Sequence, residues 1–249
     1  MDDLADSLVK ASGQPLQTGR RPIGIIGGSG PEAGVDLWSK VLRENQRRLG
    51  ALYRGDLDAP EVIIHSDPLL GLSMELEQNE ALVWERLRRA AVAIADSTAA
   101  YAIACNTLNY FAAKLQDLKL PAELVSFQSE VSALIERERL ERLCLLGAAP
   151  VTSMNGWSAY DGLQDLLEVE GVKEPAALHQ LIYDIKVLGP AAEPLRPRFA
   201  EILSRVESEV VLLACTELPL IADIETDKRL VDVTDLVAAA LVERSFAGH

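Results

Sequence analysis

The sequence predicts an α/β protein made of two similar lobes, each with a largely parallel β-sheet, and three observations support this fold class. Short apolar stretches alternate with amphipathic stretches along the 249 residues, as they do where helices connect parallel strands. The same order of elements starts again near residue 142, which indicates a duplicated unit. Two apolar runs, one in each half, end in Ala-Cys. We therefore expect lobes related by pseudo-twofold symmetry, with an active cleft between them.

The first half contains four short runs rich in Val, Ile, Leu and Ala, which are typical of buried strands. The expected strands cover residues 22–26, 62–66, 102–105 and 124–127. Apolar residues at three- and four-residue intervals indicate helices between them. One expected helix begins at Pro31, after a Gly-Gly-Ser-Gly turn. Two others cover residues 76–100 and 109–115.

The second half repeats this pattern. The expected strands cover residues 142–146, the surroundings of Val169, and residues 210–215. The expected helices cover residues 157–167, 176–186, 198–208 and 234–246, and the last of them is expected to pack back on the first lobe. We therefore divide the chain into a flexible N-terminal tail (1–21), a first lobe (22–128) and a second lobe (129–249).

Composition and charge restrict the possible partners. The chain has a formal net charge of −14 and no basic, aromatic-rich face, so we do not expect it to bind nucleic acid. No apolar run approaches the roughly 18–20 residues that a membrane span needs. Three cysteines without a Cys-x-x-Cys pair predict neither a disulfide framework nor a structural zinc site, and they favour a reducing, cytoplasmic environment. We expect a small-molecule substrate and no metal ion.

Two cysteines occupy equivalent places in the two halves. Residues 101–110 read YAIACNTLNY and residues 209–221 read EVVLLACTELPLI, so Cys105 and Cys215 each end an apolar strand. In parallel α/β sheets, ligands bind at the carboxyl ends of the strands. The sequence therefore predicts that both thiols face one cleft.

A matched thiol and thiolate can invert a carbon atom that lies beside a carboxylate. The thiolate removes the proton from one face, and the thiol returns a proton to the other. Local hydrogen-bond donors must stabilise the thiolate and the substrate carboxylate. Asn106, Thr107 and Thr216, which follow the two cysteines, are suited to that role.

Several motifs together resemble the aspartate/glutamate racemase family, whose members need no pyridoxal phosphate. The matching stretches are IGIIGGSGPEA at residues 23–33, RGDLDAPEVII at 54–64, CNT at 105–107, IYDIK at 182–186 and CTELPL at 215–220. The resemblance covers nearly everything from residue 23 onward. It implies an isomerase that uses no cofactor, forms a possible homodimer and acts on an acidic amino acid, aspartate or glutamate.

By this resemblance, Cys105 and Cys215 are the two acid/base residues. The residues expected around the substrate α-carboxylate are Ser29, Gly30, Asn106, Thr107 and Thr216. The residues that match further family positions near the substrate are Arg54, Thr152, Lys186 and Glu217. Of these, Arg54 and Lys186 are associated with recognition of the substrate's charged groups.

The sequence also departs from the family pattern. Ser29 stands where many relatives have Met, and Asn109 stands where a His follows the Cys-Asn-Thr motif. Residues 66–71 read SDPLLG in place of an Ile-Pro-Asp-Arg stretch. These changes leave the two-thiol chemistry intact but weaken the choice of substrate, so aspartate or glutamate is a default.

Other interpretations are open at this point. Maleate isomerases, which also retain two cysteines, and hydantoin racemases belong to the same superfamily. A non-catalytic protein that binds small acids or senses redox state would keep the same cleft, and Cys105 and Cys215 would then form a regulatory disulfide. Cys144, inside an apolar run, fits a core position. His65, at the end of a strand, either lines the cleft or has a structural role.

Overall fold

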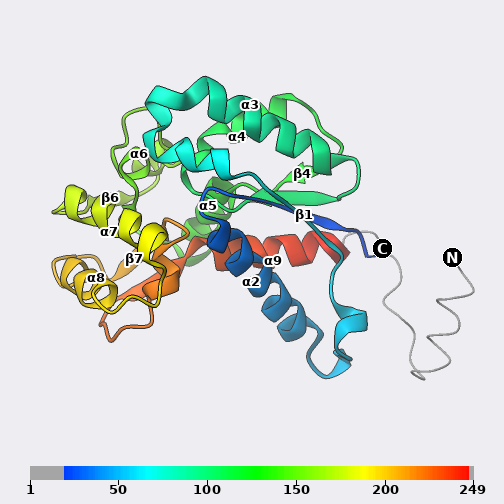
Figure 1. Cartoon of the computed structure of the whole chain (residues 1–249). Coiled ribbons are helices and arrows are strands. Elements are labelled where there is room, and N and C mark those ends of the chain that lie inside the picture. Colours follow the sequence, from blue (N-terminus) through cyan, green and yellow to red (C-terminus); the bar gives the residue numbers. More distant parts are fainter. Residues whose placement is uncertain (1–19, 247–249) are drawn as a thin grey trace, which may run out of the picture.

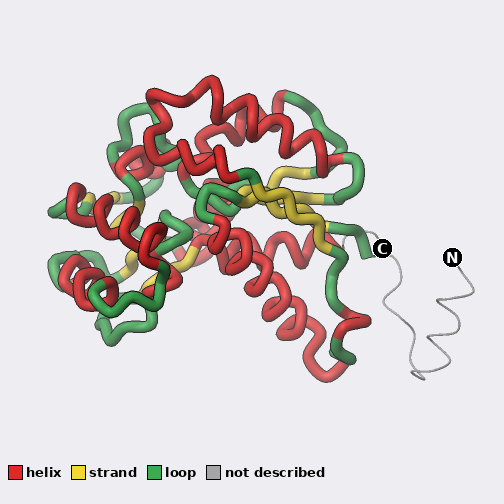
Figure 2. Tube along the Cα trace, viewed as in Figure 1, coloured by secondary structure: helices red, strands yellow, loops and turns green. Residues whose placement is uncertain are grey.

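Two four-stranded parallel β-sheets, one from each half of the chain, form the centre of the structure (Figure 1). The structure is a computed structural model that describes residues 20–246. Residues 1–19 of the expected N-terminal tail lie outside this described range. Helices surround both sheets (Figure 2). The predicted α/β fold with two lobes is therefore confirmed.

The two sheets have the same strand order. The first contains β1 (Ile23–Gly27), β2 (Val62–Ser66), β3 (Ala100–Ile103) and β4 (Glu123–Leu124) in the order β2-β1-β3-β4. The second contains β5 (Arg142–Gly147), β6 (Glu168–Gly171), β7 (Val210–Ala214) and β8 (Arg229–Asp232) in the order β6-β5-β7-β8. All neighbouring strands are parallel. This shared topology is what a duplicated unit predicts.

The helices of the first lobe cover both faces of its sheet. They are α2 (Pro31–Leu49), α3 (Leu76–Ala95), α4 (Ala112–Asp117) and α5 (Phe127–Glu138). Successive residues of β1 alternate between the faces: Ile25 packs in the cluster that contains α2 and α5, and Ile26 packs in the cluster that contains α3. The expected lobe boundary after residue 128 falls inside α5 and stays a prediction.

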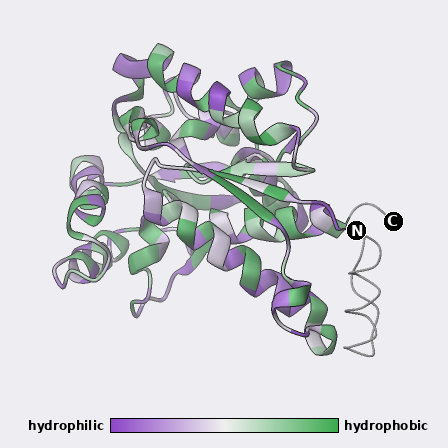
Figure 3. Cartoon of the chain, turned by 45° about the vertical axis from the view of Figure 1, so that its right-hand side comes forward, coloured by the Kyte–Doolittle hydropathy of each residue, from purple (hydrophilic) through white to green (hydrophobic). Residues whose placement is uncertain are grey.

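The helices of the second lobe are α6 (Ala149–Thr152), α7 (Pro175–Leu188), α8 (Leu195–Leu203) and α9 (Val233–Phe246). α7 and α8 pack on one face of the second sheet, and α9 packs against α2 and α5 of the first lobe. Residues of both sheets, such as Ile25 and Leu212, share one hydrophobic cluster. The strands are mostly hydrophobic, whereas the outer helices mix hydrophobic and hydrophilic segments (Figure 3).

Several expected boundaries in the first half are wrong. The helix expected over 76–100 ends at Ala95, because residues 96–99 turn into β3 and the Thr98 hydroxyl donates to the Ile94 carbonyl. The strand expected over 124–127 is shorter, because the Ser126 hydroxyl accepts from the Ser129 amide and begins α5.

Corrections in the second half follow from similar local chemistry. The helix expected over 157–167 is only the 3₁₀ helix η5 (Asp161–Asp165). The helix expected over 198–208 lies earlier, at α8, where Pro197 occupies the first turn and its missing N–H costs no helical bond. The edge strand β8 was not expected, because only the two middle residues of its Arg-Leu-Val-Asp sequence are apolar and they form no apolar run.

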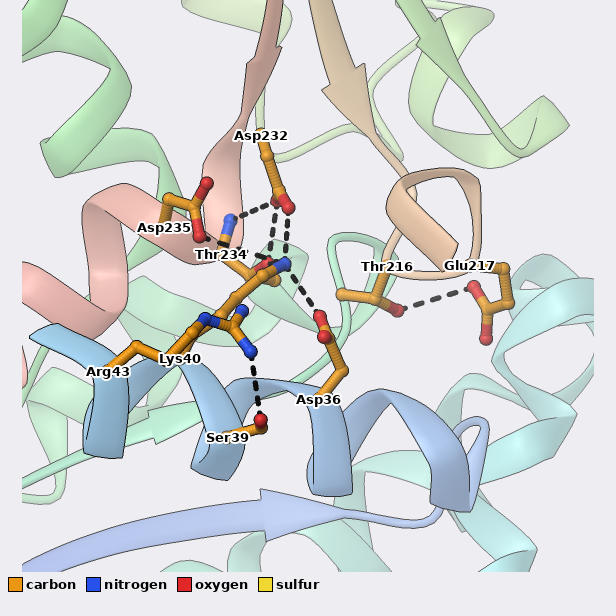
Figure 4. A network of polar contacts seen from close by, with 9 residues as sticks. All are labelled: Asp36, Ser39, Lys40, Arg43, Thr216, Glu217, Asp232, Thr234 and Asp235. Carbon is orange, nitrogen blue, oxygen red and sulfur yellow. Dashed lines mark hydrogen bonds and ion pairs between the residues drawn. The ribbon is translucent and has the colours of Figure 1, made fainter. Parts of the chain in front are cut away.

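A buried lysine connects α2 of the first lobe to β8 and α9 (Figure 4). The Lys40 side chain is 6% exposed and forms ion pairs with Asp232 and, at 2.6 Å, with Asp36. Its ammonium also donates to the Thr234 hydroxyl, and the Asp232 carboxylate accepts from the Thr234 amide at the start of α9. Burial alone would lower the pKa of Lys40, but Asp232 and Asp36 together raise it above its ordinary value. Lys40 therefore stays charged and fixes α2 against the second sheet.

We predict that Lys40→Met destabilises the protein by about 2–4 kcal/mol, because it leaves buried carboxylates without their cation. The loss of stability is expected to be smaller than for a fully buried ion pair, since the side chains of Asp36 and Asp232 are 19% and 13% exposed. Urea denaturation measures the free energy of unfolding. The control is Arg47→Met on the same helix, which removes a cation that is 75% exposed and should leave the denaturation midpoint nearly unchanged. Equal midpoints for the two variants would contradict the proposed role of Lys40.

Candidate active site

Cys105 and Cys215 line the same small cavity at the carboxyl ends of the two sheets. Cys105 follows the central strand β3, and Cys215 directly follows the central strand β7. The cavity is lined by Ser29, Ser73, Met74, Cys105, Asn106, Thr107, Ala148, Lys186, Ala214, Cys215, Thr216 and Glu217. Its free space is about 10 Å³, which is close to the room that one water molecule needs. The structure therefore brings together most of the residues that the sequence predicted, in a closed state.

Two serine hydroxyls surround the thiol of Cys105. The Ser29 Oγ lies 3.2 Å from the Cys105 Sγ, and the Ser73 Oγ lies 3.8 Å from it. The two hydroxyls are 2.7 Å apart and both serines are buried. Hydroxyl donors at these positions can stabilise a negative charge on the sulfur. Ser29 was expected here, whereas Ser73, on the 3₁₀ helix η3 (Pro68–Glu75), was missed.

A carboxylate occupies the corresponding position beside Cys215. The Cys215 thiol donates to the Glu217 Oε2 at 2.9 Å, and the Thr216 hydroxyl donates to the same oxygen at 3.3 Å. Burial, and after it the negative charge of Glu217, raise the pKa of Cys215 well above its ordinary value, although Lys186 opposes this effect. Cys215 is therefore held as a neutral thiol, with a carboxylate in position to accept its proton.

Lys186, on α7, spans the two lobes. Its ammonium forms an ion pair with the Glu217 carboxylate and lies 3.5 Å from the Ser29 carbonyl oxygen in the first lobe. Burial alone would lower the pKa of Lys186, but Glu217 and Cys215 raise it above its ordinary value. Lys186 is thus a cation at neutral pH, and it is the only cationic side chain that lines the described cavity.

The amide of Asn106 has an unused hydrogen-bond donor. The Asn106 side chain is buried, and its Oδ1 accepts a hydrogen bond from the Tyr160 hydroxyl. Burial, and then the charge of Cys105, raise the pKa of Tyr160 well above its ordinary value, so the phenol remains a donor. The Asn106 Nδ2 has no partner among residues 20–246. Because a buried donor without a partner is costly, this N–H group is suited to bind a ligand oxygen.

The glycine turn of the first lobe is required by close packing. Gly28 and Gly30 have φ angles of 109° and 82°, which disfavour other residues. A Cβ atom at Gly30 would lie 2.3 Å from the Glu217 Oε1. Gly30 also lines a second cavity of about 400 Å³, together with Pro31, Glu32 and the Lys186–Glu217 pair. That pair therefore separates the closed cysteine cavity from an open outer cavity.

Two predicted substrate contacts lie elsewhere. Arg54 follows α2 and pairs with Asp58, with 2.6 Å between its Nη2 and the carboxylate Oδ1. Thr152, at the end of α6, directs its hydroxyl to the Ala148 carbonyl at 3.4 Å. Neither residue lines the cysteine cavity. Their roles in substrate binding stay predictions.

Asn109, which replaces the family His, has a structural position. Its Nδ2 donates to the Cys105 carbonyl at 2.8 Å, and its Oδ1 accepts from the Phe127 amide at 2.9 Å. The side chain therefore fixes the turn after β3 to the start of α5. Cys144 is fully buried in the second lobe, where burial raises its pKa to about 12. Neither residue lines the cavity.

The described part of the chain offers few other types of site. Within residues 20–246, no group of three or more His, Cys, Asp and Glu side chains is placed to hold a metal ion. No helix in the same range is both long and apolar enough to cross a membrane.

Comparison with known proteins identifies the family. The family model for Asp/Glu/Hydantoin racemase matches residues 26–243, and the chain belongs to this family. A search of curated protein sequences found no significant match.

Solved structures have the same fold. An aspartate racemase from Picrophilus torridus is 19% identical, with a TM-score of 0.75 over 90% of this chain and 94% of the other. A putative Asp/Glu racemase from Yersinia pestis is 17% identical, with a TM-score of 0.73 over 90% and 99% of the two chains. A glutamate racemase from Francisella tularensis, solved with D-glutamate, is 17% identical, with a TM-score of 0.63 over 90% and 80%.

We predict that Glu217→Gln lowers the pKa of Cys215, because it removes the adjacent negative charge and leaves the Lys186 cation without its carboxylate. The measurement is the ultraviolet absorbance of the thiolate as a function of pH in a Cys105→Ser background. Burial raises the pKa of Cys144 to about 12, so this thiol stays mostly protonated over the lower part of the titration. The matched control is Glu32→Gln, which makes the same change in the outer cavity. A Cys215 titration that is unchanged by Glu217→Gln would contradict this assignment.

Proposed function

We propose that the protein is a cofactor-independent amino-acid racemase that acts on aspartate or glutamate through a proton shift between two cysteines. The observation that supports this function best is the shared cavity, which contains one thiol from each lobe and the unpartnered amide of Asn106. Membership of the racemase family supports the same reaction class. The relatives' names do not decide between the two substrates, since they include aspartate and glutamate racemases.

In the proposed reaction, the Cys105 thiolate takes the α-proton of the substrate. The electron pair of the broken C–H bond moves into the adjacent carboxylate, which becomes an enediolate. The Cys215 thiol then gives its proton to the opposite face, and the electron pair forms the new C–H bond. The step leaves Cys105 as thiol and Cys215 as thiolate, ready for the reverse direction. Donors that face the enediolate, such as the Asn106 Nδ2, stabilise its charge.

Glu217 supports the reverse direction of this exchange. Cys215 must lose its proton before it can act as a base, and the raised pKa of Cys215 makes that loss unfavourable without help. The Glu217 Oε2 already accepts the hydrogen bond of the Cys215 thiol. Glu217 is therefore placed to take the proton directly and to return it.

The preference for an acidic substrate rests on Lys186. The closed cavity has no room for an amino acid, so the Lys186–Glu217 pair must separate before the substrate reaches the thiols. The separation frees the Lys186 ammonium for a new carboxylate. The second carboxylate of aspartate or glutamate can replace the lost ion pair of Lys186 with Glu217, whereas a neutral side chain cannot.

Facing thiols must stay reduced for this chemistry, which suits the cytoplasmic environment that the cysteine content predicts. The homodimer implied by the family resemblance also stays a prediction.

A maleate or hydantoin substrate, or a binding protein without turnover, is the alternative that the following experiment distinguishes.

We predict that the protein exchanges the α-proton of aspartate or glutamate with solvent deuterium and inverts the carbon, as measured by NMR under reducing conditions with each enantiomer. Cys105→Ser and Cys215→Ser should each reduce racemisation by about 10²–10⁴-fold, because each variant lacks an essential acid or base. Cys144→Ser is the matched control and should keep wild-type activity, since Cys144 lies outside the cavity.

Absence of exchange with every amino acid would contradict the proposed function and favour the maleate, hydantoin or binding alternatives. Exchange without inversion would show that only one thiol is competent.

A further inference from the structure

A cavity lined by several positively charged side chains lies outside the proposed active site, beside β2 and α3. It has a volume of about 440 Å³, and its polar lining consists of His65, Asp67, Arg86, Arg88 and Arg89. We refer to it as the arginine cavity. His65, which was expected either to line the cleft or to be structural, lies here and not at the cysteines.

Local structure explains how these charges gather. His65 is two residues from Ile63, which packs in the cluster that contains α3, so alternation along β2 directs both side chains to that face. Arg86 and Arg89 are three residues apart on α3 and therefore share a helix face. The cavity concentrates three guanidinium groups in a chain of net charge −14.

The guanidinium groups are not equally neutralised. Arg86 pairs with Asp67 at 2.6 Å, and Arg88 pairs with Glu85 at 3.0 Å. Arg89 forms no hydrogen bond or ion pair with any residue in the described part of the chain. Guanidinium groups bind phosphate and carboxylate oxygens through paired hydrogen bonds. The cavity is therefore suited to a small anion that carries more than one charge.

Asp67 connects this cavity to the proposed active site. Its side chain is 5% exposed, and its Oδ2 accepts from the Arg86 Nε at 2.6 Å. Its Oδ1 accepts from the Leu69 amide at 3.1 Å and thereby caps the 3₁₀ helix η3. Its main-chain amide donates to the Gly27 carbonyl, in the turn that carries Ser29. A Cβ atom at Gly28 would lie 2.1 Å from the Asp67 carbonyl oxygen, so this contact is tight.

The helix that Asp67 caps ends beside a catalytic thiol. η3 contains Ser73, whose hydroxyl contacts both the Ser29 hydroxyl and the Cys105 sulfur. η3 is eight residues long, whereas 3₁₀ helices longer than three to four residues are uncommon because their hydrogen-bond geometry is poorer. The cap at Asp67 and the contact of Ser73 with Cys105 therefore belong to one short segment.

We propose that the arginine cavity binds a small multivalent anion, and that the bound anion competes with Asp67 for Arg86 and shifts Ser73 away from Cys105. The anion is thus an inhibitor of any reaction that uses Cys105. Phosphate-bearing and polycarboxylate compounds share the required chemistry. The binding site stands independently of the proposed racemase activity, whereas inhibition of racemisation rests on it.

Binding is tested by calorimetry with pyrophosphate and with citrate at constant ionic strength. At least one of the two should bind, and the one that binds identifies the anion as phosphate-bearing or polycarboxylate. Arg89→Gln should weaken binding at least about tenfold, because it removes the guanidinium group without an internal partner. The matched control is Arg47→Gln on α2, which changes an exposed arginine outside this cavity and should bind as the wild type does. No binding of either anion, or equal binding by Arg89→Gln, would overturn the site.

Coupling is tested without reference to the substrate. In a Cys215→Ser background, the anion that binds should change the rate at which iodoacetamide alkylates Cys105 by at least about fivefold, the lower end of typical allosteric coupling. The effect should be absent in the additional Arg89→Gln variant. An alkylation rate that the bound anion leaves unchanged would overturn the coupling even where the site is occupied. If alkylation responds but no amino acid is racemised, the proposed function fails and the anion site stands.

Discussion

The contact of Lys186 with Glu217 and with the Ser29 carbonyl is the interaction on which the rest of the site depends. It joins α7 of the second lobe to the glycine turn of the first lobe. It also neutralises the carboxylate that lies beside Cys215 and closes the cysteine cavity toward the outer one. Gly30 is part of the same contact, since any larger residue would collide with Glu217. Access to the thiols, their charges and the alignment of the lobes are therefore linked.

The equivalent strand ends of the two sheets, after β3 and β7, have different surroundings. Cys105 lies against two hydroxyls, and Cys215 lies against a carboxylate. Because burial and Glu217 raise the pKa of Cys215, the site holds a defined acid on one side. The proposed proton exchange between the two cysteines would thus start from two different surroundings. The asymmetry is set by residues next to the cysteines and not by the strands that carry them.

The sequence predicted the parts of the fold that depend on local pattern. The apolar runs before Cys105 and Cys215 located β3 and β7, and the repeated element order predicted two equivalent sheets. The predicted element boundaries were wrong where a side chain redirects the main chain, as at Ser126. The edge strand β8 was missed, because pairing with β7 and not an apolar run of its own defines it.

The same distinction applies to the site. Residues beside a motif cysteine, such as Asn106 and Glu217, were predicted to lie near the thiols and line the cavity. Ser73 was missed, because it reaches Cys105 only through the path of η3, and the apolar residues around it give no polar signal. Tyr160 was missed because its hydrogen bond to Asn106 joins residues that are 54 positions apart. Arg54 was predicted from a motif, but the structure places it in an ion pair with Asp58.

The central claim is that both thiols face one substrate whose carboxylate binds the amide of Asn106. A crystal structure of the Cys105→Ser variant with L-aspartate or L-glutamate bound tests it most directly, because this variant lacks one of the two proposed acid/base groups. We predict an α-carboxylate oxygen within hydrogen-bond distance of the Asn106 Nδ2, with the α-carbon between residue 105 and the Cys215 sulfur. A ligand with residue 105 and the Cys215 sulfur on the same face of its α-carbon would contradict this claim. A ligand bound without contact to Asn106 would also contradict it.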